Sequence, residues 1–166
     1  MSNFDWTRFV VKVNINTSLE KLYSGWVTRK GIEEWFLRVA EYYDDQGRLR
    51  SETEPAIEGD TYKWLWFGWP DETVERGKML HANGINELSF SFGKAGNCSI
   101  TITPYNNEFM VELVQDKIPD TEEGRQYYHL GCKMGWTFYL SNMKSVLEGG
   151  IDLRHRDLAT TDMVNK

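Results

Sequence analysis

The chain has 166 residues, of which 40% are hydrophobic and 27% charged, which excludes a disordered chain and fits one globular domain over residues 1–166. Nineteen Lys and Arg residues against 25 Asp and Glu residues give a net charge of −6, which works against nucleic acid or anionic lipid as a partner. No run of 18 apolar residues occurs, and the amino terminus carries no basic segment followed by an apolar run, so we expect a cytoplasmic protein with no membrane span.

The first predicted elements are a strand and two short helices. Apolar residues recur with a period of two over residues 9–15, which is typical of a strand with one buried face. Thr17 and Glu20 have the spacing of a capping box, so a helix is expected to start there. Gly31 is expected to break this helix before one more helical turn over residues 32–36.

A series of short strands follows from about residue 39 to residue 116. Runs of alternating apolar residues are separated by segments rich in Gly, Asn and Asp, which tolerate positive φ angles at hairpin tips. Together with the first strand, these runs predict an antiparallel meander of about seven strands. The runs cover residues 39–43, 62–67, 74–81, 88–92, 99–103 and 109–115.

The last predicted element is a long helix. Asp120 and Glu123 have the spacing of a second capping box, and a helical apolar period continues to Leu147, after which two glycines end it. The apolar residues recur at intervals of three or four, so they form one stripe that must pack against another element. The stripe consists of Tyr128, Cys132, Trp136, Leu140, Met143 and Leu147.

Two glycines lie beside that stripe, one helical turn apart. Gly131 and Gly135 each weaken a helix by about 1 kcal/mol relative to Ala, and they leave room for close packing or for a ligand. The core of the domain is expected to span about residues 8–150. Residues 154–166 carry few large apolar side chains and are expected to fray.

Side chains that could carry chemistry are scattered along the chain. Cys98 and Cys132 form no C-x-x-C pair and have no Asn–His pattern around them, so we interpret both as inert small residues. His81, His129 and His155 form no i, i+4 pair and no H-E-x-x-H motif. The sequence therefore supports neither a metal site nor a cofactor.

His81 is the one weak catalytic candidate. It stands at the end of a predicted inward strand face, where it is either a hydrogen-bonded wall residue or, with Tyr128 or Glu112, a general acid or base. Glu112 either points to solvent, as strand alternation favours, or is a buried carboxylate with a raised pKa. Trp69 lies near the tip of a predicted hairpin crossing, as an exposed structural residue or as part of a lid.

The order of elements matches the helix-grip fold, an α+β architecture in which a curved antiparallel sheet wraps a long C-terminal helix. Several stretches resemble the START-related superfamily (SRPBCC), and within it they look most like homologues of the activator of the heat-shock protein 90 ATPase. The resemblance extends over roughly residues 8–154. It rests on residues 13–36, on Gly77-Lys78-Met79-Leu80 before Leu88-Ser89-Phe90, on residues 111–115, and on Gly135-Trp136 with Leu140 and residues 147–154.

This resemblance implies an apolar cavity between the sheet and the closing helix. A carrier or sensor that binds a small hydrophobic or aromatic ligand is the first hypothesis. A protein-binding module that stimulates a chaperone ATPase is the second, and a cyclase-like enzyme that uses His81 is the third. The cavity is either open or filled by its own aromatic side chains. By the resemblance, its lining would be Trp26, Trp35, Trp64, Trp66, Met79, His81, Phe90, Phe92, Met110 or Val111, Tyr128, Trp136 and Leu140.

Overall fold

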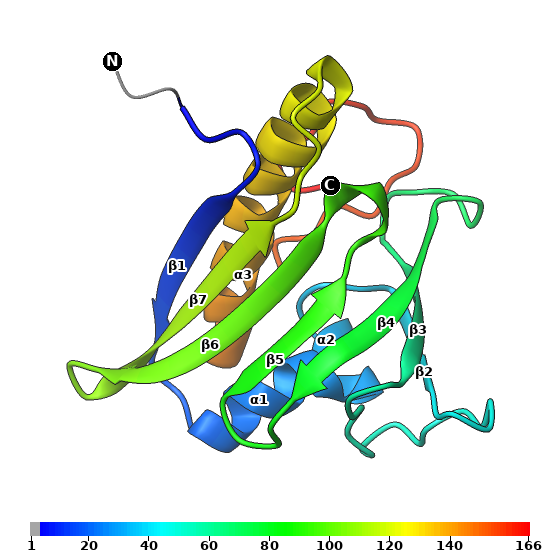
Figure 1. Ribbon diagram of the computed structural model, residues 1–166. Helices are drawn as coiled ribbons and strands as arrows, with labels where there is room; N and C mark the ends of the chain where they lie inside the picture. The colour runs from blue at the N-terminus through cyan, green and yellow to red at the C-terminus, as the bar shows by residue number, and fades with distance from the viewer. Residues whose placement is uncertain (1–3) are drawn as a thin grey trace.

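Seven strands form one antiparallel sheet in the computed structural model, which describes residues 4–166. Their order across the sheet is β1-β7-β6-β5-β4-β3-β2, so β2 to β7 form a meander and β1 pairs with β7. The sheet curves around the long helix α3 (Cys132–Leu147), as Figure 1 shows. The strands are β1 (Phe9–Ile15), β2 (Val39–Tyr43), β3 (Thr61–Leu65), β4 (Val74–Ala82), β5 (Glu87–Ser91), β6 (Asn97–Tyr105) and β7 (Glu108–Asp116).

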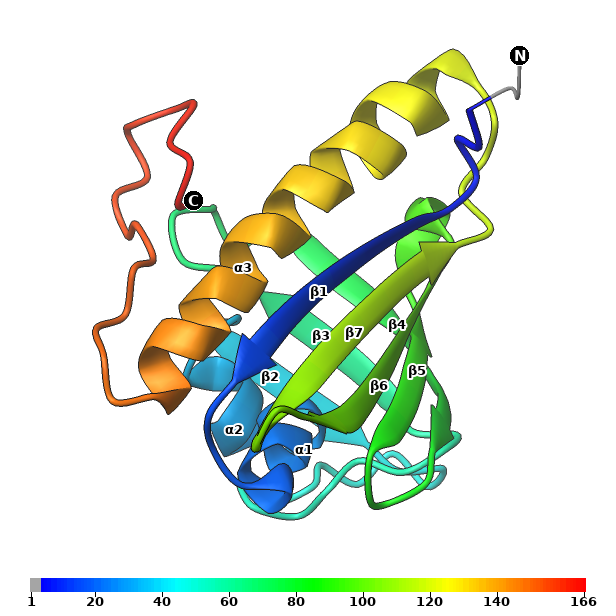
Figure 2. The same cartoon turned by 90° about the vertical axis from the view of Figure 1, so that its left-hand side faces the viewer.

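Two short helices close one end of the curved sheet. They are α1 (Leu19–Val27) and α2 (Arg29–Glu33), and they lie near the C-terminal end of α3 (Figure 2). The predicted α+β helix-grip architecture is confirmed, and each predicted strand agrees with the observed one to within about two residues at either end. Within residues 4–166, no helix combines the length and the hydropathy that a membrane crossing requires. The prediction about the amino terminus includes residues 1–3, which lie outside the described range.

The concave face of the sheet carries the core. In β5 the inward residues Leu88 and Phe90 are buried, and in β7 the inward residues are Val111, Leu113 and Gln115. The outward residues between them stay partly exposed, as the period of two predicts. Each fully buried large apolar side chain contributes roughly 1.5–3 kcal/mol, so this face and the α3 stripe account for the packing of helix on sheet. The buried residues of α3 are Trp136, Tyr139, Leu140, Asn142, Met143 and Leu147.

The caps of the two short helices differ from the prediction. Ser18, not Thr17, caps α1, because its hydroxyl accepts a hydrogen bond from the backbone N–H of Lys21 at 3.2 Å. The break between the helices lies at Thr28, whose hydroxyl accepts from the backbone N–H of Gly31 at 3.0 Å. Gly31 therefore lies inside α2, and the prediction that it breaks the helix is wrong. Thr28 can serve as the break because it adopts an extended backbone, which suits a β-branched residue.

Replacing Gly31 with Ala is expected to lower the free energy of unfolding by about 1–3 kcal/mol. The new Cβ would overlap the carbonyl oxygen of Ser24 and lie 2.7 Å from Oγ1 of Thr28, and backbone atoms cannot move aside as a flexible side chain can. The same substitution at Gly135, where nothing lies within 4 Å of the Cβ position, is expected to raise that free energy by up to about 1 kcal/mol. Urea denaturation of both variants tests this; shifts of the same sign would contradict it.

The closing helix begins at residue 122 and continues as a π-helical segment, η2 (Gly124–Gly131), which leads directly into α3. The predicted cap at Asp120 is wrong. Thr121 caps the helix instead, because its hydroxyl accepts a hydrogen bond from the first backbone N–H of η2 at 3.0 Å. The Asp120 carboxylate pairs with the guanidinium of Arg125 at 2.6 Å, so it is not free to cap. The predicted end of the helix at Leu147 is confirmed.

Candidate functional site

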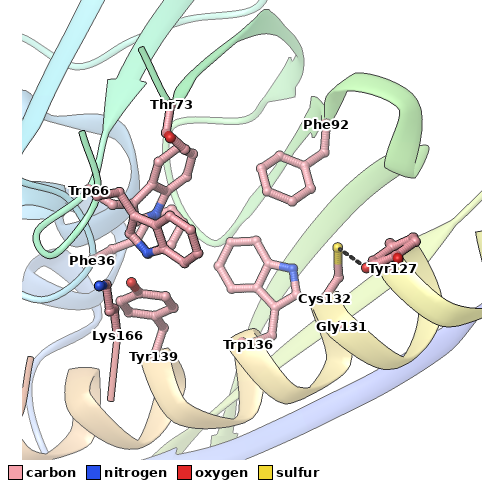
Figure 3. A pocket seen from close by; sticks show the side chains of 12 residues that line it. Phe36, Trp66, Thr73, Phe92, Tyr127, Gly131, Cys132, Trp136, Tyr139 and Lys166 are labelled. Carbon is pink, nitrogen blue, oxygen red and sulfur yellow. Dashed lines mark hydrogen bonds between the residues drawn. The ribbon is translucent and has the colours of Figure 1, made fainter. Parts of the chain in front are cut away.

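A pocket of about 290 Å³ opens between the concave face of the sheet and the first half of α3. Its walls come from five places in the chain: the turn after α2, the β3–β4 connection, the residue after β5, the closing helix and the C-terminal tail. Figure 3 shows these side chains converging on one space from the sheet and from the helix. The lining residues are Phe36, Trp66, Trp69, Thr73, Phe92, Tyr127, Gly131, Cys132, Gly135, Trp136, Tyr139 and Lys166.

Trp136 forms the floor of the pocket, and its orientation is held by a buried polar pair. Its indole Nε1–H donates to Oε1 of Gln115 at 2.9 Å, and Nε2 of Gln115 donates to the carbonyl of Ala95 at 2.9 Å. The ring of Phe36 packs 4.9 Å from that of Trp136 and the ring of Phe92 packs 5.7 Å from it, between centroids. The floor is therefore a set of interlocked aromatic rings with a defined geometry.

The polar groups of the pocket are few. The hydroxyls of Thr73 and Tyr139 have no hydrogen-bond partner among residues 4–166, so each can bind a ligand atom. Burial raises the pKa of Tyr139 to about 12, so its hydroxyl keeps its proton at neutral pH. Burial also raises the pKa of the Cys132 thiol, which agrees with the interpretation of this cysteine as inert.

Three of the predicted cavity residues line this pocket: Trp66, Phe92 and Trp136. Most of the others point inward as expected, but they fill the interior and are covered by their neighbours. The sequence left open whether the cavity is empty or filled by its own aromatic side chains. In this deeper part of the domain the side chains fill it. The residues concerned are Trp26, Trp35, Trp64, Met79, Phe90 and Leu140.

His81 lies on the outer face of the sheet, not in the cavity. Met79 pairs with Phe90, but the next pair is His81 with Ser89, so β4 carries one extra residue at Leu80. This bulge reverses the alternation, because a shift of one residue moves a side chain to the opposite face. The His81 side chain is 48% exposed and lies near two surface glutamates. The prediction that it faces the cavity is wrong.

Two further candidates also lie away from the pocket. Met110 is partly exposed on the outer face, because Val111 is the inward residue at this point of β7. Glu112 shares the outer face and pairs with Lys12 at 2.7 Å, so the solvent-facing alternative for Glu112 is confirmed. Cys98 is buried against Gln115, and burial raises the pKa of its thiol, as expected of an inert cysteine.

The π-helical winding replaces Tyr128 with its neighbour Tyr127 as a pocket residue. In a π-helix residues five apart lie one turn apart, so Tyr127 precedes Cys132 on the pocket side. The sulfur of Cys132 is 3.8 Å from the carbonyl oxygen of Tyr127, which reflects this spacing. The hydroxyl of Tyr128 donates to Glu123 at 3.0 Å. The prediction assumed α-helical spacing, which places Tyr128 on the pocket side, so it could not identify Tyr127 as the lining residue.

The C-terminal tail brings a lysine to the mouth of the pocket. Residues 154–166 contain no helix or strand, and they run back past α3 toward the β3–β4 connection (Figure 2). The side chain of Asn165 donates to the carbonyl of Leu153 at 2.7 Å. This path places Nζ of Lys166 5.5 Å from the ring centroid of the partly exposed Trp69. Fraying of this segment in solution stays a prediction.

The start of the tail is expected to loosen in acid. Burial would raise the pKa of Asp152, but hydrogen bonds from the side chain and backbone of Arg154 outweigh burial and hold that pKa at about 2, against an ordinary value of 3.8. A carboxylate with a lowered pKa stabilises the folded state above its ordinary pKa, and the contribution is lost as the pH falls toward the folded value.

The backbone N–H of Arg154 donates to the Asp152 carboxylate at 3.1 Å, so it reports the protonation of that carboxylate. The amide resonance of Arg154 should therefore shift between pH 4 and pH 2. Two-dimensional amide NMR measures this. An Asp152→Asn variant is the control and should show no such titration, and a wild-type resonance that stays constant in this window would contradict the assignment.

Some pocket residues carried no signal in the sequence. Lys166 and Thr73 reach the pocket through the paths of a tail and a loop, which no local pattern describes. Tyr139 follows Trp136 by three residues in a helix and could have been included on that spacing. Phe36, the last residue of the predicted turn over residues 32–36, lies in the pocket wall, whereas its neighbour Trp35 is buried.

Among residues 4–166, no three His, Cys, Asp or Glu side chains come together as a metal site would require. The chain matches no protein-family model, and no curated protein matches it in sequence.

Solved structures with the same architecture do exist. The solution structure of the Aha1 dimer from Colwellia psychrerythraea is 16% identical, with a TM-score of 0.66 over 86% of this chain and 97% of that one. Protein SSP2350 from Staphylococcus saprophyticus is 18% identical, with a TM-score of 0.67 over 91% of this chain and 98% of that one. DynU16, described as a putative protein in the dynemicin biosynthetic locus, is 15% identical, with a TM-score of 0.62 over 86% of this chain and 48% of that one. The chain therefore has the helix-grip fold that the Aha1 dimer also has, as its sequence resemblance predicted.

Proposed function

We propose that the chain is a carrier or sensor that binds a small, flat, apolar molecule in the pocket beside Trp136. The observation that carries this proposal is an open space of about 290 Å³ with seven aromatic side chains around it. An engineered apolar cavity of about 150 Å³ holds benzene, so this pocket has room for a molecule of about two fused rings. The glycines at positions 131 and 135 contribute to that room, because neither places a side chain in it.

The geometry supports binding more than catalysis. The catalytic candidate, His81, is separated from the pocket by the sheet, so the hypothesis of an enzyme that uses His81 lacks a substrate beside its base. The likeness to the Aha1 dimer supports a second candidate function, a module that contacts a heat-shock protein 90 type chaperone. Stimulation of such a chaperone's ATPase by the purified chain tests the second candidate, and an unchanged ATPase rate would argue against it.

The binding proposal is tested with naphthalene-2-carboxamide, a neutral probe of two fused rings. We expect saturable shifts of the indole N–H resonances of Trp66 and Trp136 in amide NMR, because both rings line the pocket. A His81→Ala variant serves as a control and should bind the probe as the wild type does. An absence of shifts up to the solubility limit of the probe would contradict the proposal, as would shifts confined to residues outside the pocket.

A further inference from the structure

We infer that the pocket selects an aromatic acid, whose carboxylate binds Lys166 and Tyr139 at the mouth while its rings lie against Trp136; this inference rests on the proposed function. The first observation is the charge of the lining. Lys166 is its one charged residue, and no Asp or Glu lines the pocket within residues 4–166. An anion loses its hydration in an apolar pocket and needs a paired cation there, so a lone cation favours an anionic ligand over a neutral one.

The amine of Lys166 is held in place and still has a donor to spare. Its Nζ donates to the carbonyl of Thr160 at 2.6 Å and approaches that of Leu158 at 3.3 Å. No carboxylate side chain within residues 4–166 lies within 4 Å of this nitrogen. An ammonium has three N–H donors, so one donor is available to a ligand. The charge of Lys166 also acts on the carboxylate of Asp157, which lies beyond direct pairing distance.

The Tyr139 hydroxyl supplies a second donor to the same pocket. It is protonated at neutral pH and has no partner among the described residues. Figure 3 shows Tyr139 and Lys166 at the same end of the pocket, with Trp136 between them and Cys132. A carboxylate that accepts from both donors would be held more strongly than a neutral amide, because hydrogen bonds to a charged acceptor are the stronger ones.

The opposite end of the pocket would reject a carboxylate. Glu75 lies beside Gly93, next to Phe92, with its Oε1 2.8 Å from the position of a Cβ on Gly93. Its side chain is partly buried, and burial raises its pKa, which marks a carboxylate that already lacks hydration. A second negative charge at this end would be repelled, so an acid is expected to enter with its rings toward Phe92 and its carboxylate toward Lys166.

The test compares two probes of the same shape, naphthalene-2-carboxylate and naphthalene-2-carboxamide, by titration calorimetry at pH 7. We expect the carboxylate to bind at least about tenfold more tightly. A Lys166→Met variant should lose this preference and keep its affinity for the amide. A matched control, Lys21→Met, removes an exposed lysine on α1 that does not line this pocket, and it should leave both affinities unchanged.

The outcomes separate this inference from the proposed function. If both probes bind equally to the wild type, the preference for an acid is overturned and the pocket still binds apolar molecules. If Lys166→Met weakens both probes to the same extent, the lysine orders the mouth and does not recognise a charge, which also overturns the inference. If neither probe binds, the proposed function itself fails.

Discussion

Replacing Asp60 with Ala is expected to lower the free energy of unfolding by about 3–5 kcal/mol, the largest effect on stability that we predict. Asp60 and Arg50 are 2% and 7% exposed, and the guanidinium of Arg50 binds both oxygens of the carboxylate, with Nη2 2.9 Å from Oδ1. The carboxylate also accepts from the backbone N–H of Ile57 at 2.9 Å. Within residues 4–166, truncation would leave the buried guanidinium with Glu54 as its one carboxylate partner, at 2.6 Å. Guanidinium chloride denaturation at pH 7 measures the loss.

An exposed ion pair gives the control for this prediction. Asp71, whose side chain is 77% exposed, pairs with Arg38, and Asp71→Ala should change the free energy of unfolding by less than about 1 kcal/mol. A double variant that replaces Arg50 with Met and Asp60 with Leu should recover part of the loss, because it removes both buried charges. Equal losses in Asp60→Ala and Asp71→Ala would contradict the assigned role of burial.

Replacing Gly135 with Leu is expected to weaken binding of naphthalene-2-carboxamide by at least about tenfold, the largest effect on binding that we predict. Gly135 lines the pocket, and nothing lies within 4 Å of its Cβ position. A leucine side chain there would fill part of the volume in which we propose that the ligand binds. Leu favours a helix more than Gly does, so the fold should be retained. NMR titration of the Trp136 indole resonance measures the affinity.

The control for this variant places the same side chain on the other side of α3. Thr137 is exposed there and does not line the pocket, so Thr137→Leu should bind the probe as the wild type does. A smaller change, Gly135→Ala, should reduce the affinity less than Gly135→Leu does, since it fills less space. Undiminished binding by Gly135→Leu would place the ligand elsewhere and contradict the proposed pocket.

The sequence by itself determined the strands of this protein, its long closing helix and the order in which the elements follow one another. Alternation with a period of two and the Gly, Asn and Asp residues at hairpin tips are local signals, because a strand buries every second side chain and a tight turn requires positive φ angles. The glycines at 47 and 84 and the Asn106-Asn107 pair do adopt positive φ angles. The apolar stripe of the closing helix likewise predicted its packing against the sheet, and the resemblance added the helix-grip architecture.

Only the tertiary structure decided which side chains meet in the pocket. The extra residue at Leu80 reversed the direction of His81, because strand register depends on pairing with β5 and not on β4 alone. The π-helical turn exchanged Tyr128 for Tyr127, and the path of the tail delivered Lys166 across a large separation in sequence. These outcomes depend on contacts between distant segments, which no local period can encode, and they are what defines the candidate site.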